Sequence, residues 1–271
     1  MPELPEVETT LRGIAPHITN RTILECVFRT ERLRWPLDET LCHLLPGQKI
    51  ISVERRAKYL LLHCDDGTII LHLGMSGSLR IVPAETTEKK HDHVDLIFTD
   101  GTCLRLTDPR KFGAFLYTDE DPCTYKLLLN LGPEPLTDEF NGEYLYSASR
   151  GKKQPVKQFI MDQKTVVGVG NIYANESLFS AGIRPDRAAG RIGLERYRTL
   201  AFAIKNILQE AIIAGGTTIQ DFNQADGKPG YFAQQLQVYG RGGGCCFACG
   251  QTILSQKIGQ RSTFYCAGCQ S

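Results

Sequence analysis

Apolar residues recur along the chain with two different periods, that of helices and that of strands. The positions where the period changes divide the chain into segments. The first residues carry apolar side chains at helical spacing, namely Val7, Leu11, Ile14 and Ile18. This spacing predicts a short amphipathic helix over residues 3–16. Acidic residues in its first turn complement the helix dipole.

From residue 22 to residue 118 the pattern is that of β-strands. Short runs rich in β-branched and aromatic residues occupy 22–28, 48–54, 58–64, 68–73, 78–82, 93–98, 102–106 and 113–118. Turn signals such as Asp66-Gly67 separate some of them. A helical insertion is predicted at 37–45. Eight strands of this kind predict a sandwich or a flattened barrel.

Beyond a hinge at 131–136, which holds two prolines and a glycine, the period becomes helical. Helices are predicted at 138–147, 155–161, 171–181 and 194–214. The last has one apolar face, formed by Leu200, Ile204, Ile207, Leu208 and Ile212, and Gly215-Gly216 ends it. We therefore expect an α+β fold. Its predicted domains are a β-sandwich domain with the N-terminal helix (1–131), a helical domain (132–236), and a terminal hairpin (237–271) packed with the helical domain.

Composition predicts a soluble globular protein: 42% of the 271 residues are hydrophobic and 23% are charged. No apolar run approaches the ~20 residues of a membrane span, and the acidic N-terminus does not resemble a signal peptide. We expect a cytoplasmic protein that does not enter membranes.

Charge is unevenly distributed. Residues 1–149 hold 16 of the 31 basic and 23 of the 30 acidic residues, which leaves 15 basic and 7 acidic residues for 150–271. A basic C-terminal half suggests a polyanionic partner. Nucleic acid is the first candidate, and an acidic partner protein is the alternative.

The cysteines near the C-terminus predict a metal site. Cys246 and Cys249 form one close pair, and Cys266 and Cys269 form another after sixteen intervening residues. Four thiolates in two such pairs suit one tetrahedral, structural zinc ion, because no position is left for a catalytic water. Disulfides and free thiols are the alternatives. Cys245 is expected to be a bystander, although it could replace Cys246 as a ligand.

The remaining cysteines are scattered and are expected to be reduced. They are Cys26, Cys42, Cys64, Cys103 and Cys123. The segment between the two zinc-ligand pairs is predicted to be a β-hairpin. Arg261 lies in it, where a rigid backbone suits phosphate contact.

Pro2 and Glu3 offer candidate chemistry at the N-terminus. If Met1 is removed, Pro2 has a secondary amine that titrates near pH ~7.7–8.0, so part of it is unprotonated and nucleophilic at neutral pH. Attack on an aldehyde-level carbon would give an electron-withdrawing iminium ion. Glu3 would be a general acid beside it. The alternative is that Pro2 only permits methionine removal and starts a helix.

Several strings extend along the chain in a fixed order. They are PELPEVET, RRAKYLLL, HLGMSGSLR, TDPRKFGAF, VVGVGNIYANE, DGKPGYFAQ and QRSTFYC. Together they closely resemble the bacterial formamidopyrimidine-DNA glycosylase family over essentially the whole chain. The related endonuclease VIII enzymes share the Pro-Glu start and the zinc ribbon. They typically have glycine where this chain has Leu4.

The resemblance implies a base-excision repair enzyme acting on double-stranded DNA. It would excise oxidised purines, notably 8-oxoguanine and formamidopyrimidines, and then cut the abasic site by β- and δ-elimination. Pro2 would attack C1′, Glu3 would protonate or stabilise the opening deoxyribose, and Glu6 would support the site. We expect it to act as a monomer with one zinc ion.

The resemblance also implies a DNA interface. Met75, Arg110 and Phe112 match residues that fill the gap left by a flipped-out base. The phosphate-binding positions are matched by Lys58, His72, Lys157, Asn171 and Arg261, of which Lys58 and Arg261 are counted with the catalytic group. Residues 155–181 resemble the helix-two-turn-helix element.

A loop at 224–231, around Lys228, resembles the family's cover over the flipped base; an ordinary turn is the alternative. At Lys111 the family often has arginine, so a role there in reading the opposite base is in doubt.

Two other functions compete with this interpretation. A non-catalytic zinc-ribbon protein would bind DNA without needing a free Pro2 amine. A pyrimidine-preferring glycosylase of the endonuclease VIII type would share the chemistry but not the substrate. His91-Asp92-His93 could suggest another metal site, but it lacks a partner motif and is interpreted as structural or surface.

Overall fold

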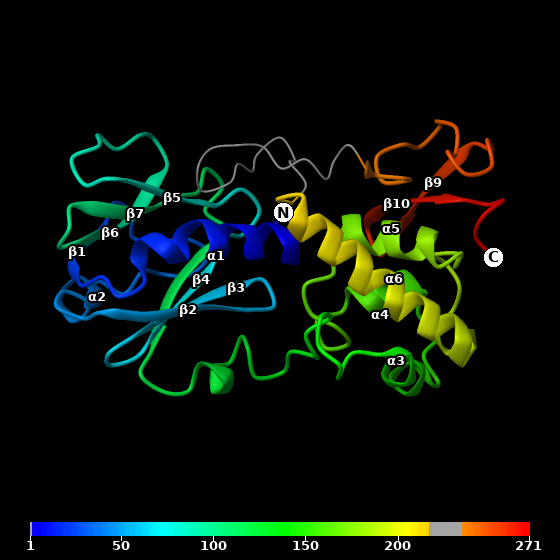
Figure 1. The fold of residues 1–271 in the computed structure, drawn as a ribbon, viewed down its shortest axis with the longest axis horizontal. Coiled ribbons are helices and arrows are strands. Elements are labelled where there is room, and N and C mark those ends of the chain that lie inside the picture. The colour runs from blue at the N-terminus through cyan, green and yellow to red at the C-terminus, as the bar shows by residue number, and fades with distance from the viewer. Residues whose placement is uncertain (1, 217–234) are drawn as a thin grey trace. The chain divides into compact units, whose positions relative to one another are not determined.

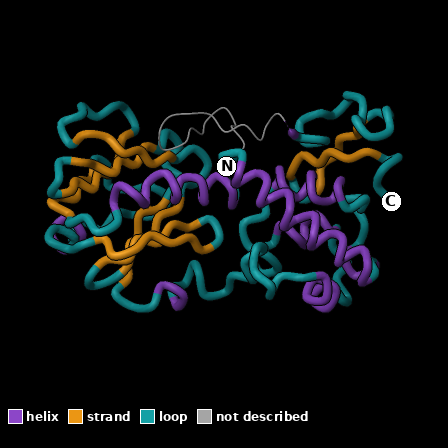
Figure 2. Tube along the Cα trace, in the orientation of Figure 1, coloured by secondary structure: helices purple, strands orange, loops and turns teal. Residues whose placement is uncertain are grey.

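The structure is a computed structural model that describes residues 2–216 and 235–271. Its described part forms two compact units. The first comprises residues 2–129 and 214–216, and the second comprises 130–213 and 235–271. Figure 1 labels the elements of both units, and Figure 2 shows that helices dominate the second. None of the described helices is both long and apolar enough to cross a membrane.

Helix α1 (Leu4–Ile18) opens the first unit, and Glu3 is its N-cap residue. It extends two residues past the predicted end at Pro16, because a proline in the last turn does not stop the helix. A proline there lacks the N–H that would bond to the carbonyl group one turn earlier, which can still bond to water. The apolar stripe predicted for this helix is buried at Val7, Ile14 and Ile18.

Eight strands build the predicted sandwich from two antiparallel four-stranded sheets. One sheet has the order β1-β6-β7-β5 and the other has the order β2-β3-β4-β8. The bounds are β1 (Ile23–Phe28), β2 (Ile50–Arg56), β3 (Tyr59–Cys64), β4 (Thr68–His72), β5 (Ser78–Pro83), β6 (Asp92–Phe98), β7 (Thr102–Thr107) and β8 (Ala114–Thr118). The predicted helical insertion is shorter, at α2 (Leu41–Leu44), and a 3-10 turn covers Pro122–Thr124.

One hydrophobic core joins the two sheets and α1. Leu60 and Leu71 from one sheet belong to the same cluster as Leu96 and Leu104 from the other, with Ile14 of α1. Burying such side chains stabilises the unit by roughly 1.5–3 kcal/mol each relative to exposure. This core fixes the ends of the strands, from which the loops that carry predicted site residues begin.

A buried ion network crosses the β1-β6-β7-β5 sheet. Asp95 accepts two hydrogen bonds from Arg105, at 2.9 and 2.8 Å, and one from Arg29 at 2.7 Å. Asp92, from the candidate His-Asp-His string, accepts from Arg80 at 2.9 Å. The string is therefore structural, as expected, because its carboxylate is already neutralised by arginine.

The second unit contains the four predicted helices: α3 (Gly142–Ser149), α4 (Val156–Met161), α5 (Asn171–Ser180) and α6 (Leu194–Ile213). A 3-10 turn covers Ala189–Arg191. Helix α3 begins four residues later than predicted, because Asn141 caps it by accepting the N–H of Tyr144 at 2.9 Å.

The terminal hairpin consists of β9 (Ile253–Ile258) and β10 (Arg261–Cys266). Its two-residue turn has positive φ at both Gly259 (56°) and Gln260 (62°), the backbone of a type I′ turn. A Cβ on Gly259 would lie 2.3 Å from Nε2 of Gln158, so this glycine allows the tip to approach α4 closely.

Candidate functional site

The N-terminal dipeptide is buried at the start of α1. Pro2 is buried, and the exposed fractions of Glu3 and Glu6 are 3% and 2%. The N–H of Glu3 donates to Oε2 of Glu6 at 2.8 Å, which is one half of a capping box. Glu6 therefore fixes the backbone of the predicted acid, Glu3, as a supporting residue would.

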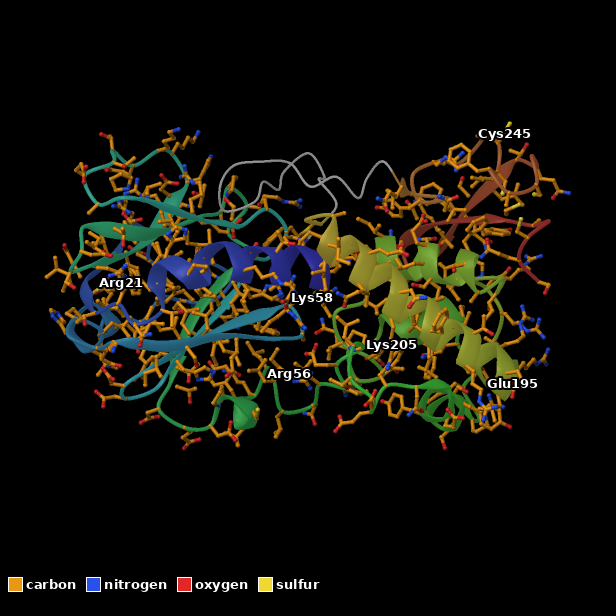
Figure 3. All side chains as sticks on the ribbon, viewed as in Figure 1. Arg21, Arg56, Lys58, Glu195, Lys205 and Cys245 are labelled. Carbon is orange, nitrogen blue, oxygen red and sulfur yellow. The ribbon has the colours of Figure 1, made fainter. Side chains whose placement is uncertain are left out.

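Lys58 lies in the turn between β2 and β3, not at the start of a strand as expected. Arg56 pairs with Tyr59, so Ala57 and Lys58 form a two-residue loop, and Ala57 takes a positive φ of 57° to close it. Arg55 donates to Ala57 O and to Glu8 of α1, both at 2.9 Å. These bonds tie the Lys58 turn to α1, and Figure 3 labels Lys58.

His72 ends β4, and its ring lies against that of Tyr59, with the centroids 4.8 Å apart. Burial, with the charges of Lys58 and Arg34, lowers the pKa of His72 to about 4. The N–H of Gly74 donates to Nδ1 at 3.0 Å. The imidazole is therefore neutral at pH 7, and its proton resides on Nε2, where it can be donated to an anion.

Two neighbouring loops carry the three predicted gap-filling residues. Met75 lies in the turn between β4 and β5, and Arg110 and Phe112 lie between β7 and β8. A Cβ on Gly74 would be 2.4 Å from the carbonyl carbon of Phe112, so the two backbones touch. The Arg110 guanidinium lies 5.1 Å from the centre of the Phe112 ring.

The side chains of Arg110 and Phe112 are exposed, and Phe112 is 44% accessible. The side chain of Met75 is half-buried. The Lys111 side chain is bound to a different segment, because its Nζ donates to Oγ1 of Thr30 at 2.8 Å.

Asp108 joins these two loops, and sequence reasoning missed it. Its side chain is fully buried and accepts from Ser76 Oγ at 2.9 Å, Gly113 N at 2.7 Å and Arg110 N at 3.3 Å. Asp108 thus crosslinks the Met75 loop to the Arg110 loop. The only local signal is an aspartate before a proline turn, which is a common turn acceptor.

Lys157, in the first turn of α4, is 1% exposed. Its Nζ donates to Ser262 O at 2.9 Å and to Thr263 Oγ1 at 2.8 Å. These are the residues that follow Arg261 in β10. Lys157 therefore fixes the strand that presents Arg261, and Arg261 itself is exposed. Direct phosphate contact by Lys157 remains a prediction.

Asn171 is the first residue of α5, after Gly168, whose φ is +81°, and Gly170. The N-terminus of a helix presents the positive end of the helix dipole to an anion. This end of α5 is therefore suited to hold a phosphate, and phosphate contact at Asn171 stays a prediction.

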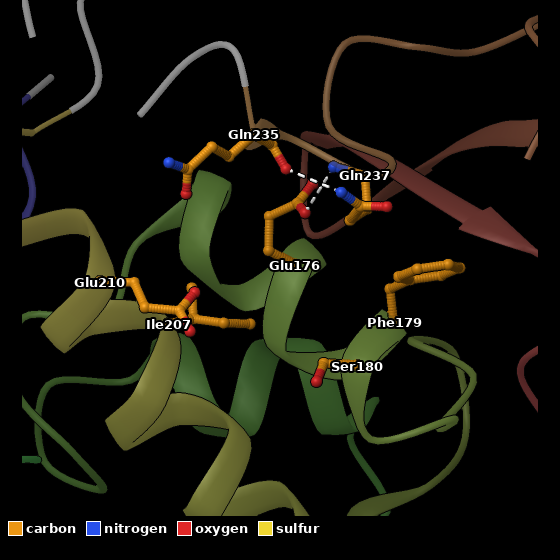
Figure 4. A pocket seen from close by; sticks show the side chains of 7 residues that line it. All are labelled: Glu176, Phe179, Ser180, Ile207, Glu210, Gln235 and Gln237. Carbon is orange, nitrogen blue, oxygen red and sulfur yellow. Dashed lines mark hydrogen bonds between the residues drawn. The ribbon is translucent and has the colours of Figure 1, made fainter. Parts of the chain in front are cut away.

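Glu176 is a second residue that sequence reasoning did not assign. Its buried carboxylate accepts the N–H groups of Gln237, Val238 and Tyr239 at 2.8, 3.0 and 2.8 Å. Figure 4 shows it beside Gln237 in a pocket that Phe179 also lines. Glu176 ties α5 to the segment leading into the hairpin. No local pattern could reveal this link, because the partners are more than sixty residues apart.

The four predicted zinc ligands come together. The Sγ atoms of Cys246, Cys249, Cys266 and Cys269 lie within 4.8 Å of one another. The distances are 3.8 Å between Cys246 and Cys269 and 3.4 Å between Cys249 and Cys266. Zinc–sulfur bonds of about 2.3 Å in a tetrahedron place sulfurs about 3.8 Å apart, so these thiols fit one zinc ion.

The group offers four sulfur ligands and excludes Cys245. The prediction of one structural zinc ion is therefore confirmed, and Cys245 lies outside the ligand group. Burial opposes ionisation of Cys246, but N–H groups of Cys249 and Ala248 and the neighbouring thiols lower its pKa to about 7.

The five remaining cysteines are free, as predicted. The loop around Lys228 lies outside the described residues.

Comparisons with known proteins agree with this geometry. Residues 1–115 match the model of the formamidopyrimidine-DNA glycosylase N-terminal domain, and residues 131–223 match that of its H2TH domain. The formamidopyrimidine-DNA glycosylases of Idiomarina loihiensis and Edwardsiella ictaluri are 59% and 57% identical to the chain over 270 residues, with 100% of each chain covered.

Solved structures show the same fold. A complex of a mutant Lactococcus lactis FPG protein with DNA containing Fapy-dG has a TM-score of 0.92 and 33% identity, with 100% of both chains covered. The FPG protein of Thermus thermophilus has a TM-score of 0.88 and 35% identity, and covers 99% of this chain and 98% of that one.

The fold and the site thus define a DNA base-excision glycosylase. More specifically, the chain belongs to the formamidopyrimidine-DNA glycosylase family. This membership includes the associated abasic-site lyase activity.

Proposed function

We propose that the enzyme excises oxidised purines from duplex DNA through covalent catalysis by Pro2, after Met1 is removed. The Pro2 nitrogen forms a bond to C1′, and the damaged base departs with the electrons of its glycosidic bond. Opening of the deoxyribose to the iminium transfers a proton to O4′, and we assign Glu3 to this step.

The iminium then drives strand cleavage. Its positive charge acidifies the C2′ proton, whose loss expels the 3′ phosphate in the β-elimination. A second elimination expels the 5′ phosphate. Water finally hydrolyses the iminium, which returns the Pro2 amine.

The remaining site residues bind and deform the DNA. Met75 and Phe112 fill the space of the flipped-out nucleotide, and Arg110 donates to the orphaned base. Phosphates are held by neutral His72, Lys58, the N-terminus of α5 at Asn171, and Arg261. Crosslinking by Asp108 allows the two gap-filling loops to enter the duplex as one body.

A single observation supports this chemistry most directly: the buried Pro2-Glu3 dipeptide, with the Glu3 N–H held by Glu6 at 2.8 Å. Covalent catalysis requires a nucleophile and an acid in fixed relation, and a flexible terminus would not supply it. We further propose that the protein works as a cytoplasmic monomer.

Borohydride trapping tests the mechanism. Wild-type protein lacking Met1 is mixed with a duplex containing 8-oxoguanine and reduced, and the crosslinked peptide is sequenced by mass spectrometry. We expect one adduct, on Pro2.

The Pro2→Gly variant retains a primary amine and should still trap an abasic-site duplex, but should lose most 8-oxoguanine excision. A correctly processed wild type that gives no adduct would overturn the lyase mechanism and favour a non-catalytic DNA-binding protein. Unchanged base release by Pro2→Gly would contradict the role of Pro2.

A further inference from the structure

The second unit has an arginine-lined pocket that the proposed reaction does not use. The pocket has a volume of about 500 Å³ and is lined by Arg184, Asp186, Arg187, Ala188, Arg191 and Ser271. Arg196 donates to the main-chain oxygens of Gly182 at 2.8 Å and of Ser271, the last residue of the sequence, at 2.7 Å. We call this the arginine pocket.

Positive charge in the arginine pocket is only partly neutralised. Arg184 pairs with Asp186 at 2.8 Å. In the described part of the chain, the guanidinium groups of Arg187 and Arg191 have no hydrogen-bonding or carboxylate partner. Burial and the charge of Arg187 lower the pKa of Arg196. Like charges gathered in a concave surface repel one another, and a bound anion would relieve that repulsion.

The backbone that presents these arginines is fixed. Val156 N donates to Arg187 O at 2.7 Å, and Lys157 N donates to Pro185 O at 3.2 Å. The Arg184 guanidinium lies over the ring of Tyr265, 5.3 Å from its centre. An anion entering the pocket would therefore meet an already ordered surface, which lowers the entropic cost of binding.

The pocket lies toward the opposite end of β10 from Arg261, the proposed phosphate contact. Tyr265, beneath Arg184, is four residues along the strand from Arg261, which corresponds to about 13 Å at ~3.3 Å per residue. The pocket is therefore separate from the Arg261 end of the hairpin.

We propose that the arginine pocket binds an acidic peptide segment of a partner protein. Guanidinium groups pair with carboxylates in bidentate geometry, as Arg184 already does with Asp186 through two bonds of 3.1 and 2.8 Å. Ala188 and the aliphatic stems of the arginines supply an apolar wall. A flexible chain can insert carboxylates and an apolar side chain into a concave site, whereas a duplex presents its phosphates on a convex surface.

The test uses a fluorescein-labelled peptide, Asp-Glu-Asp-Asp-Leu-Phe with a free carboxylate, and the full-length zinc-loaded protein. Binding is followed by fluorescence polarisation at about 50 mM salt, where surface electrostatics are weakly screened. We expect Arg187→Ala/Arg191→Ala to weaken peptide binding about tenfold or more, because two charge-assisted contacts are lost.

The matched control, Arg198→Ala/Lys205→Ala, removes the same charge from α6 and should leave peptide affinity within about twofold. A peptide with Asn and Gln in place of Asp and Glu should not bind. Affinity for an 8-oxoguanine duplex should be the same in both double variants as in wild type.

Three results would overturn the proposal. They are no peptide binding by wild type, equal weakening in the pocket and control variants, or a loss that appears with the duplex instead of the peptide. The last would make the pocket a DNA contact. Failure of Pro2 trapping would not affect the outcome, because this proposal does not depend on the reaction at Pro2.

Discussion

At the scale of single residues, His72 shows how the surroundings of a side chain set its protonation state. A histidine at the end of a strand would ordinarily titrate near pH ~6.5. Here burial and the charges of Lys58 and Arg34 lower its pKa to about 4. Its lone pair on Nδ1 is occupied by Gly74 N–H, so Nε2 is the donor.

We predict that His72 stays neutral well below the usual range of histidine. In a ¹H–¹³C NMR titration its ring signals should shift with a midpoint at pH about 4. Because its folded-state pKa is depressed, the neutral ring favours folding above the unfolded-state pKa, and that contribution is lost as pH falls toward 4. A His72 midpoint near 6.5 would contradict this assignment.

Residue-level inference succeeded where the residue carries chemistry in its own type. Four cysteines in two close pairs can be recognised without their neighbours. Asp108 and Glu176 could not, because each acts by accepting hydrogen bonds from groups that only the folded chain brings to it.

At the scale of elements, the hairpin depends on two supports: the cysteine cluster at one end and the Lys157 ammonium near Arg261. A hairpin of two short strands is marginally stable alone. Metal coordination therefore contributes much of its order.

We predict that removing zinc weakens DNA binding by releasing the Arg261 strand. The protein is treated with a chelator, one released zinc per chain is measured by a colorimetric reagent, and the affinity for a lesion duplex is compared with that of untreated protein. The zinc-loaded Arg261→Ala variant is the reference for loss of this contact alone, and chelation should weaken binding at least as much. Undiminished binding by the metal-free protein would contradict the structural role of the hairpin.

The β1-β6-β7-β5 sheet depends on a buried carboxylate. Although burial opposes ionisation of Asp95, hydrogen bonds from Arg105 and Arg29 hold its pKa below the usual value. The stabilisation is present above the unfolded-state pKa of ~3.9 and is lost as pH falls through the lower folded-state value.

We predict that Asp95→Asn destabilises the protein by about 3 kcal/mol, because it leaves Arg105 buried with only Asp92, 3.8 Å away, as a counter-charge. Urea unfolding at pH 7 measures this as a lower midpoint. Asp100→Asn, which removes the exposed pair between Asp100 and Arg21 at 3.2 Å, is the control and should change stability by less than about 1 kcal/mol. Equal effects would show that the buried network has no special role.

At the scale of the whole molecule, substrate choice separates this enzyme from its pyrimidine-preferring relatives. The Pro-Glu start and the zinc ribbon are common to both groups of enzymes, so neither feature decides which damaged base is preferred. Leu4, in place of the glycine typical of the endonuclease VIII enzymes, and the full-length relatives at 57–59% identity favour oxidised purines.

We predict faster base release from a duplex with 8-oxoguanine than from one with thymine glycol, by about tenfold or more in kcat/KM, a ratio that pocket contacts can supply. Single-turnover cleavage of the two labelled duplexes of otherwise identical sequence measures it. A preference for thymine glycol would assign the enzyme to the pyrimidine-preferring group.

The sequence by itself determined the order of elements, the sandwich and the zinc ligands. These follow from local period, ligand spacing and side-chain chemistry, which depend on near neighbours. Only the tertiary structure decided four features. They are the turn position of Lys58, the buried hydrogen bonds of Lys157 to β10, the link that Asp108 makes between two loops, and the hydrogen bonds of Glu176 to residues 237–239. Each depends on hydrogen bonds between segments distant along the chain or on strand register, and no local pattern specifies either.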